Sequence, residues 1–265
     1  MPSSGLRLTV LGSRGSSATG GPDYSEFGCS TSCYLVESQD DSVILDAGSG
    51  LLRAPVSCDK PRSIILSHLH LDHLLGLGMY SGLSCGNDRT CLFVSANTDD
   101  EARRLIERLY SPPYWPVSLW EYPGELVVCA LPQTMDIGSM HIVTMAGNHP
   151  GGSMIIRIDC MGKRIVYATD YEHDMLTFAR LTEFSRHADL VLYDAQYTDE
   201  EYEVHRGFGH STFRKGIELM RNCEAKRLLL IHHDPKSTDG VLRHRERQLG
   251  CDNVRFAREG EVIAL

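Results

Sequence analysis

Short apolar runs separated by polar turns are the dominant pattern along this chain. In the first half, runs at residues 6–11, 33–37, 42–46, 63–66 and 91–94 predict strands. In the second half, similar runs lie at 126–131, 141–145, 154–159, 164–168, 190–193 and 227–231. Helical patterns cover 99–109, 175–186, 212–222 and 238–249. Many strands with intervening helices indicate an α/β protein in which helices cover a sheet core.

Length and composition favour one soluble unit. The chain has 265 residues, of which 42% are hydrophobic, so a single domain over residues 1–265 can bury a substantial core. No apolar stretch approaches the roughly 18 residues of a membrane span. The first residues lack a basic segment followed by an apolar one, the pattern of a secretory signal. We therefore expect a cytoplasmic protein without membrane contact.

Four metal-ligand side chains occur within six positions after the apolar run at 64–66: His68, His70, Asp72 and His73. Alternation along an extended chain sends His68 and His70 to one side. Asp72 and His73 would begin a helix predicted over 71–77. Two donor pairs with different directions suit two metal ions, which lie roughly 3.5–4 Å apart in two-metal hydrolases. The alternative is a histidine-rich surface turn or a few hydrogen-bonded core histidines.

Three further donors follow apolar runs elsewhere. His149 comes after the predicted strand at 141–145, Asp170 ends the run at 164–168, and His232 closes the run at 227–231. The carboxyl ends of strands deliver residues to the sites of α/β proteins. Each residue taken alone is more often structural, but together with the His68 cluster they form one set.

The motif H-x-H-x-D-H with a downstream His, Asp and His resembles the metallo-β-lactamase superfamily. The resemblance extends from residues 8–13 through 43–48 to 230–232. It implies a four-layer αββα sandwich with one ion on His68, His70 and His149. It also implies a second ion on Asp72, His73 and His232, with Asp170 bridging. The cofactor is then two divalent ions: zinc is expected first, and imidazole and carboxylate donors also suit manganese, iron or cobalt.

Gly209-His210-Ser211-Thr212 resembles the H-S-T segment of ribonuclease Z and of small cyclic phosphodiesterases, including phosphoribosyl 1,2-cyclic phosphate phosphodiesterase. The resemblance implies phosphodiester hydrolysis, in which a hydroxide between two ions attacks phosphorus. Asp72 would orient or deprotonate that water, and His210 would stabilise the transition state or protonate the leaving oxygen. Alternatively, His210 has no chemical role and Ser211 or Thr212 only caps the next helix.

Three residues could support the ligands from behind. Asp46 and Asp194 end apolar runs, and either could accept the free N–H of a ligating imidazole. Asp46 could equally stabilise the turn into Gly48. His233 points away from His232 on an extended chain, so a supporting role is the most it can have. His173 fits a solvated helix start better than a substrate contact.

The formal net charge of −9 disfavours sequence-independent binding to long nucleic acids, which depends on many Lys and Arg. We expect a small phosphodiester, either a 3′,5′-cyclic nucleotide or a cyclic ribose phosphate. A ribonuclease Z-like RNA endonuclease remains an alternative. Hydrolysis of a lactone, thioester or β-lactam by the same ions is another.

The Pro- and aromatic-rich segment 111–124 is too rigid and too apolar for an idle loop. Its Tyr114 and Trp115 could wall the site and stack on a base or sugar. The segment could equally form a contact in a homodimer or plug the core. A symmetric dimer is the general prior for oligomers.

Overall fold

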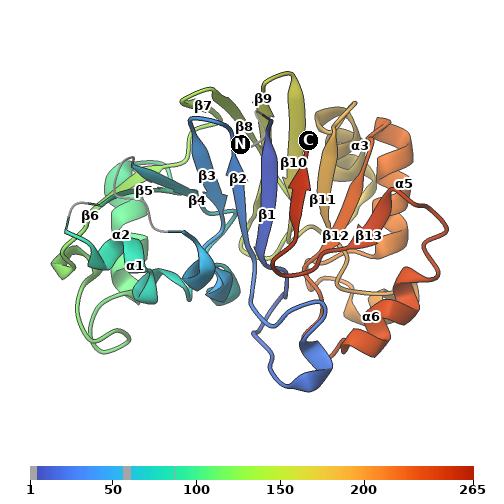
Figure 1. The fold of residues 1–265 in the computed structure, drawn as a ribbon, viewed down its shortest axis with the longest axis horizontal. Coiled ribbons are helices and arrows are strands. Elements are labelled where there is room, and N and C mark those ends of the chain that lie inside the picture. The colour runs from blue at the N-terminus through green and yellow to red at the C-terminus, as the bar shows by residue number, and fades with distance from the viewer. Residues whose placement is uncertain (1–4, 56–60, 87) are drawn as a thin grey trace.

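Two seven-stranded mixed sheets face each other in the computed structural model, which describes residues 5–55, 61–86 and 88–265. The first sheet has the spatial order β14 (Val262–Ala264), β1 (Arg7–Gly12), β2 (Cys33–Glu37), β3 (Ser42–Leu45), β4 (Arg62–Ile65), β5 (Arg89–Val94) and β6 (Glu125–Ala130). The second has the order β13 (Val254–Phe256), β12 (Leu228–Ile231), β11 (Leu190–Asp194), β10 (Lys163–Ala168), β9 (Met154–Cys160), β8 (Met140–Ala146) and β7 (Thr134–Ile137). The sheets stand side by side in Figure 1.

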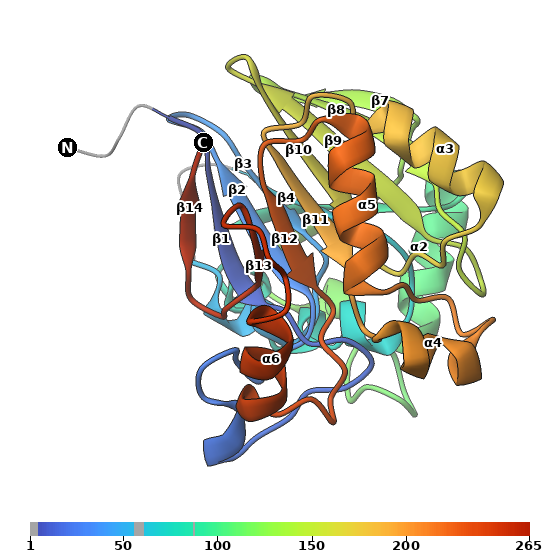
Figure 2. The ribbon, with the colours of Figure 1, turned by 90° about the vertical axis from the view of Figure 1, so that its right-hand side faces the viewer.

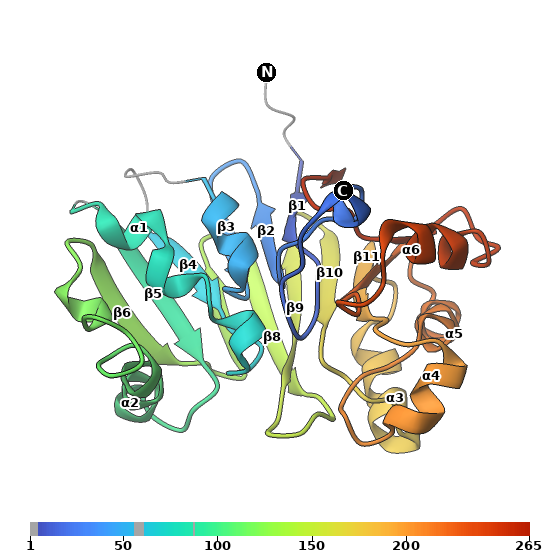
Figure 3. The same ribbon diagram turned by 90° about the horizontal axis from the view of Figure 1, so that it is seen from below.

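Helices cover the outer face of each sheet, as Figures 1 and 3 show. The α-helices are α1 (Ser81–Ser84), α2 (Asp99–Leu109), α3 (Met175–Phe184), α4 (Asp199–His205), α5 (Phe213–Cys223) and α6 (Asp239–Glu246). Short 3₁₀ turns are η1 (Pro22–Tyr24), η2 (Ser49–Arg53), η3 (Leu71–His73), η4 (Leu77–Met79) and η5 (Leu119–Glu121). Helices α1 and α2 pack against the outer face of the first sheet, and α3 and α5 cover the outer face of the second (Figure 2).

Three apolar clusters hold these layers together. One lies between the sheets and combines residues such as Val10 and Val43 with Ile156 and Ile231. The second packs α3 and α5 on the second sheet, and the third packs α2 and the 3₁₀ turns on the first. This arrangement is the predicted four-layer αββα sandwich, and each layer is formed because a sheet buries both of its faces.

The two sheets share a pairing pattern that positions the site. Strands β3 to β6 are parallel to one another, as are β10 to β13, whereas the remaining pairs are antiparallel. Parallel strands end at the same edge of a sheet, so β4, β10 and β12 bring the residues that follow them to related positions. This is where the predicted ligands lie in the sequence.

The sequence pattern located most of the elements but not all. It missed the short strands β7, β13 and β14, the four-residue helix α1 and the seven-residue helix α4. Residues 71–77, predicted as the first turn of a helix, form a 3₁₀ turn over Leu71–His73 that does not continue as an α-helix; η4 follows, and Gly76 between them is packed so tightly that a Cβ would lie 2.2 Å from the carbonyl oxygen of Gly48. In the described part of the chain, no helix has the length and apolar content needed to cross a bilayer.

Candidate metal centre

Side chains from four separate loops meet at one end of the sandwich. His68, His70, Asp72 and His73 follow β4, His149 follows β8, Asp170 follows β10, and His232 follows β12. Six of them are buried, with at most 9% of their surface exposed, whereas His70 is exposed to solvent. The structure therefore brings together the whole set of residues that the sequence nominated.

These donors divide into two groups around Asp170. In one group, the Nε2 atoms of His68 and His149 each lie 3.6 Å from Asp170 Oδ1. In the other, the Nε2 atoms of His73 and His232 lie 3.1 and 3.2 Å from Asp170 Oδ2.

His70 completes the first group, with its Nδ1 atom 3.1 Å from Nε2 of His149. Asp72 completes the second, with its Oδ2 atom 3.2 Å from Nε2 of both His73 and His232. Asp170 offers one oxygen to each group, so its position matches that of a bridging carboxylate.

Four of the imidazoles are oriented by a hydrogen bond at Nδ1, the ring nitrogen that points away from the centre. His68 Nδ1 lies 3.0 Å from Ser67 Oγ, and His73 Nδ1 lies 2.6 Å from Asp46 Oδ2. His149 Nδ1 donates to the carbonyl oxygen of Gly209 at 2.8 Å. Each partner fixes a tautomer in which Nδ1 carries the proton and the Nε2 lone pair points to the centre.

His232 has an equivalent partner that sequence analysis missed. Its Nδ1 lies 2.8 Å from Oε1 of Gln196, and the amide NH₂ of Gln196 lies 3.2 Å from the Tyr197 hydroxyl. That second bond assigns the amide oxygen of Gln196 to the side facing His232. Gln196 is buried and lies two residues after Asp194, the last residue of β11, and its sequence context carries no signal of a role at a metal site.

Two observations show that these residues fit metal ions. The Nε2 atoms of His68 and His73 are buried and have no hydrogen-bond partner among the described residues. Unpaired buried nitrogens aimed at carboxylates are the arrangement that a cation satisfies. The donor set contains only imidazole and carboxylate, which suits zinc, manganese, iron and cobalt.

Electrostatics support the same interpretation. Burial, together with the nearby His73, lowers the pKa of His68 to about 2, so His68 is neutral and its lone pair is available. For His232, burial opposes protonation, but Asp170 and Asp72 outweigh it and raise the pKa to about 9. The pKa of Asp170 is well below its usual value, because His232 and His73 outweigh the effect of burial. His73 and His232 likewise outweigh the effect of burial on Asp72 and lower its pKa, so Asp72 and Asp170 both stay ionised and attract positive charge to the centre.

Asp46 holds one of these imidazoles rather than a turn. Its carboxylate is fully buried and also accepts hydrogen bonds from the Ser67 amide at 2.6 Å and hydroxyl at 2.8 Å, and from the Tyr167 hydroxyl at 2.6 Å. Of the two interpretations left open by the sequence, the structure favours support of His73.

His210 lies beside the centre. Its Nδ1 lies 2.8 Å from Asp194 Oδ2 and 3.9 Å from Asp170 Oδ1, and its ring stacks on that of His232 with centroids 4.8 Å apart. Asp194 therefore supports His210, not one of the seven nominated ligands. Because Nδ1 is bound to Asp194, Nε2 is the ring nitrogen left for another partner.

The alternative for His210 was that it has no chemical role and that Ser211 or Thr212 only caps the next helix. Thr212 caps α5 by accepting a hydrogen bond from the Lys215 amide. Ser211 Oγ lies 2.7 Å from the Tyr193 hydroxyl and 2.8 Å from Nδ1 of His173. Capping thus needs no contribution from His210. His173 directly precedes Asp174, the N-cap of α3, so the predicted helix start is confirmed, but its side chain is half-buried and bonded to Ser211 rather than fully solvated.

His233 lies on the opposite side of the chain from His232, as predicted, and its side chain contacts none of the nominated ligands. Its ring packs between Phe27 and Phe256, with centroids 6.1 and 5.7 Å away, and Nε2 lies 2.9 Å from the carbonyl oxygen of Ala257. Burial, with the charge of Arg14 nearby, lowers the pKa of His233 to about 3. His233 is a neutral core residue on the far side of the chain from His232.

The two aromatic residues proposed as a substrate wall have different environments. Trp115 packs edge-on against Tyr110 at 5.5 Å, and its Nε1 donates to the Tyr122 hydroxyl at 3.1 Å. A Cβ on Gly78 would lie 2.2 Å from the indole, so Trp115 fills the core of the first half. Tyr114 beside it is 74% exposed. The contacts of Trp115 fit the core-plug alternative rather than a stacking platform.

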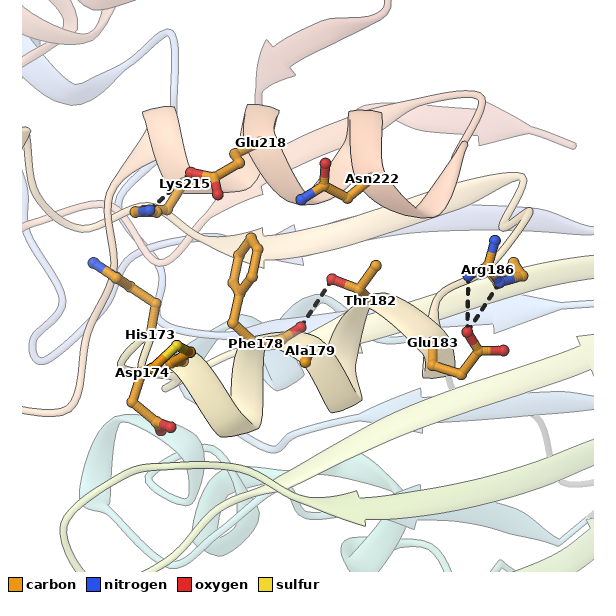
Figure 4. Close-up of a pocket in the computed structure, with 11 residues that line it drawn as sticks. His173, Asp174, Phe178, Ala179, Thr182, Glu183, Arg186, Lys215, Glu218 and Asn222 are labelled. Carbon is orange, nitrogen blue, oxygen red and sulfur yellow. Dashed lines mark hydrogen bonds and ion pairs between the residues drawn. The ribbon is translucent and has the colours of Figure 1, made fainter.

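A separate groove of about 700 Å³ lies between α3 and α5. Figure 4 shows Phe178 and Thr182 of α3 facing Lys215, Glu218 and Asn222 of α5 across it. It contains none of the nominated metal ligands, so it is distinct from the metal centre.

Comparison with known proteins agrees with this description. The model of the "Beta-lactamase superfamily domain" family matches residues 42–233. The metallo-β-lactamase fold protein YhfI of Bacillus subtilis has a crystal structure that superposes with a TM-score of 0.74 and 21% identity. That alignment covers 98% of this chain and 99% of YhfI.

Two other similar proteins have names that describe phosphoester chemistry. Ribonuclease Z of Thermoplasma acidophilum is 24% identical over 77% of this chain and 80% of its own length. The crystal structure of a diphosphatase of the PhnP family superposes with a TM-score of 0.72 and 18% identity, covering 98% of both chains. The matched family region contains all seven nominated ligands. The family match, the fold and the His/Asp groups able to hold metal ions show that the chain belongs to the metallo-β-lactamase superfamily of hydrolases.

Proposed function

We propose that this protein is a metal-dependent phosphodiesterase that hydrolyses a small cyclic phosphodiester, either a 3′,5′-cyclic nucleotide or a cyclic ribose phosphate. The observation that carries the proposal is the His210–Asp194 pair beside the metal centre. Hydrolysis of a thioester by the same ions has no evident need for this pair, because a thiolate leaves without being protonated. A phosphodiester with an alkoxide leaving group does need a proton donor.

The ions would be held in two sets. His68, His70 and His149 would hold one, Asp72, His73 and His232 the other, and Asp170 would contact both. When bound, two such cations lower the pKa of water and neutralise charge on phosphoryl oxygens.

The protein's own residues then orient and exchange protons. The Asp72 carboxylate accepts a hydrogen bond from the Ser16 amide at 2.7 Å. It stays ionised because His73 and His232 outweigh the effect of burial and lower its pKa. It can therefore orient the attacking water or accept its proton. Asp194 holds the Nδ1 proton of His210, which leaves Nε2 to deliver a proton to the leaving oxygen.

A small substrate is favoured by charge. The formal net charge is −9, and binding to long nucleic acids depends on Lys and Arg side chains that neutralise many phosphates. The similarity to proteins named ribonuclease Z supports a second candidate, an RNA endonuclease. Tyr114, exposed on the loop after α2, remains the candidate for stacking on a base or sugar, and a homodimer remains a hypothesis.

A substrate panel tests the proposal. The zinc- and manganese-loaded proteins would be assayed with bis(p-nitrophenyl) phosphate, 3′,5′-cyclic nucleotides, cyclic ribose phosphates, a diphosphate ester, a precursor tRNA, a thioester and nitrocefin. We expect the highest kcat/KM on a cyclic diester. Preferred cleavage of the precursor tRNA would establish the second candidate, and turnover of only the thioester or nitrocefin would refute both.

A further inference from the structure

Glu172 lies two residues after Asp170 and makes contacts that neither metal binding nor the His210–Asp194 pair explains. Its Oε1 atom accepts hydrogen bonds from the Gly207 amide at 2.8 Å and from the Tyr202 hydroxyl at 3.0 Å. Its Oε2 atom accepts from the Gly209 amide at 2.9 Å. One carboxylate thus receives donors from both α4 and the loop that follows it.

That loop carries two contacts of the centre. The carbonyl oxygen of Gly209 accepts the Nδ1 proton of His149, and the next residue is His210. Gly207 and Gly209 have positive φ values of 86° and 90°, and a Cβ on Gly209 would lie 2.1 Å from Nδ1 of His149. The backbone therefore approaches the imidazole as closely as only glycine permits.

Glu172 satisfies the amides that this conformation turns inward. Between the two glycines, the Phe208 amide donates to the carbonyl oxygen of His205 at 3.1 Å. The amides of Gly207 and Gly209 both point at Glu172 instead. Hydrogen bonds from backbone N–H groups to an ionised carboxylate are about twice as strong as neutral ones.

The backbone of Glu172 is itself tied to the loop of His149. Its amide donates to the carbonyl oxygen of Asn148 at 2.8 Å, and the side-chain amide of Asn148 donates to the carbonyl oxygen of Glu172 at 2.9 Å. Glu172 thus connects the loops after β8 and β10 with the loop before α5.

We infer that Glu172 is a positioning residue: it clamps residues 207–209 and thereby aligns both His149 and His210. This inference rests on the proposed function for the role of His210, but the part concerning His149 depends only on metal binding. Removing the clamp should weaken metal binding through His149 and slow proton delivery by His210 in the same variant.

The test compares Glu172→Gln with Glu203→Gln. The substituted amide would point an NH₂ group at one of the glycine amides, whereas Glu203 is exposed on α4 and pairs only with Arg206 among the described residues. Zinc affinity would be measured by competition with a chromophoric chelator, because loss of a residue supporting a ligand typically costs 10–100-fold. We expect about a tenfold loss for Glu172→Gln and no change for Glu203→Gln.

A second measurement separates alignment of His210 from general damage. Turnover would be compared for a cyclic diester, whose alkoxide must be protonated, and for bis(p-nitrophenyl) phosphate, whose leaving group needs no proton. The kcat of Glu172→Gln should fall at least fivefold more on the cyclic diester. Unchanged zinc affinity together with an unchanged ratio of kcat values would overturn the inference.

Amide hydrogen exchange in the unaltered protein keeps the inference testable if Glu172→Gln does not fold. The Gly207 and Gly209 amides should exchange slowly, and free exchange of both would refute the clamp. If the unaltered protein hydrolyses no phosphodiester, the proposed function fails, while zinc affinity and hydrogen exchange still decide the role of Glu172.

Discussion

Replacement of Gln196 by leucine isolates the contribution of one buried hydrogen bond to metal binding. Leucine has a similar volume but no acceptor for the Nδ1 proton of His232, which lies 2.8 Å from the amide oxygen in the native protein. His232 is fully buried, so water cannot replace that acceptor. A buried donor left without a partner costs about 1–3 kcal/mol.

Although burial opposes protonation, Asp170 and Asp72 raise the pKa of His232 to about 9, so without a metal the ring carries a proton on Nε2 as well as on Nδ1. In the leucine variant the imidazole can avoid the cost by releasing its Nδ1 proton. The remaining proton would stay on Nε2, which lies 3.2 Å from both Asp72 Oδ2 and Asp170 Oδ2. That tautomer has no lone pair for a cation. Metal binding must therefore restore the unfavourable tautomer, and the affinity should fall by the same 1–3 kcal/mol, about 5–150-fold.

Gln196→Glu is the matched control. Like leucine, glutamate cannot donate to the Tyr197 hydroxyl or to Ser16 Oγ, but it keeps an acceptor for His232. Zinc affinity of both variants would be measured by chelator competition after their folding is checked by circular dichroism. We expect Gln196→Glu to bind at least as tightly as the unaltered protein. Equal affinity of Gln196→Leu and Gln196→Glu would refute the argument that this acceptor sets the tautomer of His232.

Three further predictions follow from the site and its surroundings. His210→Ala should retain both metal equivalents but lose about 100-fold or more in kcat on an alkyl diester, whereas Asp170→Ala should lose metal. Elemental analysis and steady-state kinetics check both variants, and full activity of His210→Ala would exclude His210 from the reaction. Trp115→Ala should destabilise the fold by about 3 kcal/mol in urea with kcat/KM unchanged within about twofold, whereas a raised KM at unchanged stability would restore the substrate-wall interpretation. Chelation of ions present at about 100 times their dissociation constant should remove roughly 2.7 kcal/mol for each of the two ions and lower the melting temperature by roughly 10–20 °C in calorimetry. An unchanged melting temperature would argue against a metal centre.

The ligand set was visible in the sequence because side-chain identity carries the information. A His or Asp directly after an apolar run is conspicuous, and parallel strands bring such positions to one edge. Residues 68, 70, 72, 73, 149, 170 and 232 do converge, although no pattern in the sequence measures their distances. The pairing of His210 with Asp194, in contrast, needed the fold, because the two side chains come from different loops.

The supporting contacts could not be predicted in the same way. His149 is oriented by the carbonyl oxygen of Gly209, and any residue has a carbonyl oxygen. Glu172 and Gln196 look like ordinary polar loop residues until the fold places backbone amides or an imidazole beside them. The strands β7, β13 and β14 have three or four residues, which is too few for an alternating pattern to be distinguished from a loop.

Backbone conformation at the strand ends indicates how the centre is held. Seven described residues other than glycine have positive φ, and four of them surround the metal centre: Ser16, Asp46, Asp170 and His232. Such conformations cost of order 1–3 kcal/mol and persist only where surrounding contacts impose them.

Here those contacts belong to the protein itself. The carbonyl oxygen of Asp170 accepts the Ser153 hydroxyl at 2.8 Å, and the side chain of His232 is fixed by Gln196. Ser16 is held through its amide by Asp72. Because these hydrogen bonds lie within the chain, we expect them to hold the ligands in place without help from the ions. The free energy of ion binding is then available for affinity rather than for ordering the loops, which is the physical advantage of building the centre on the ends of buried strands.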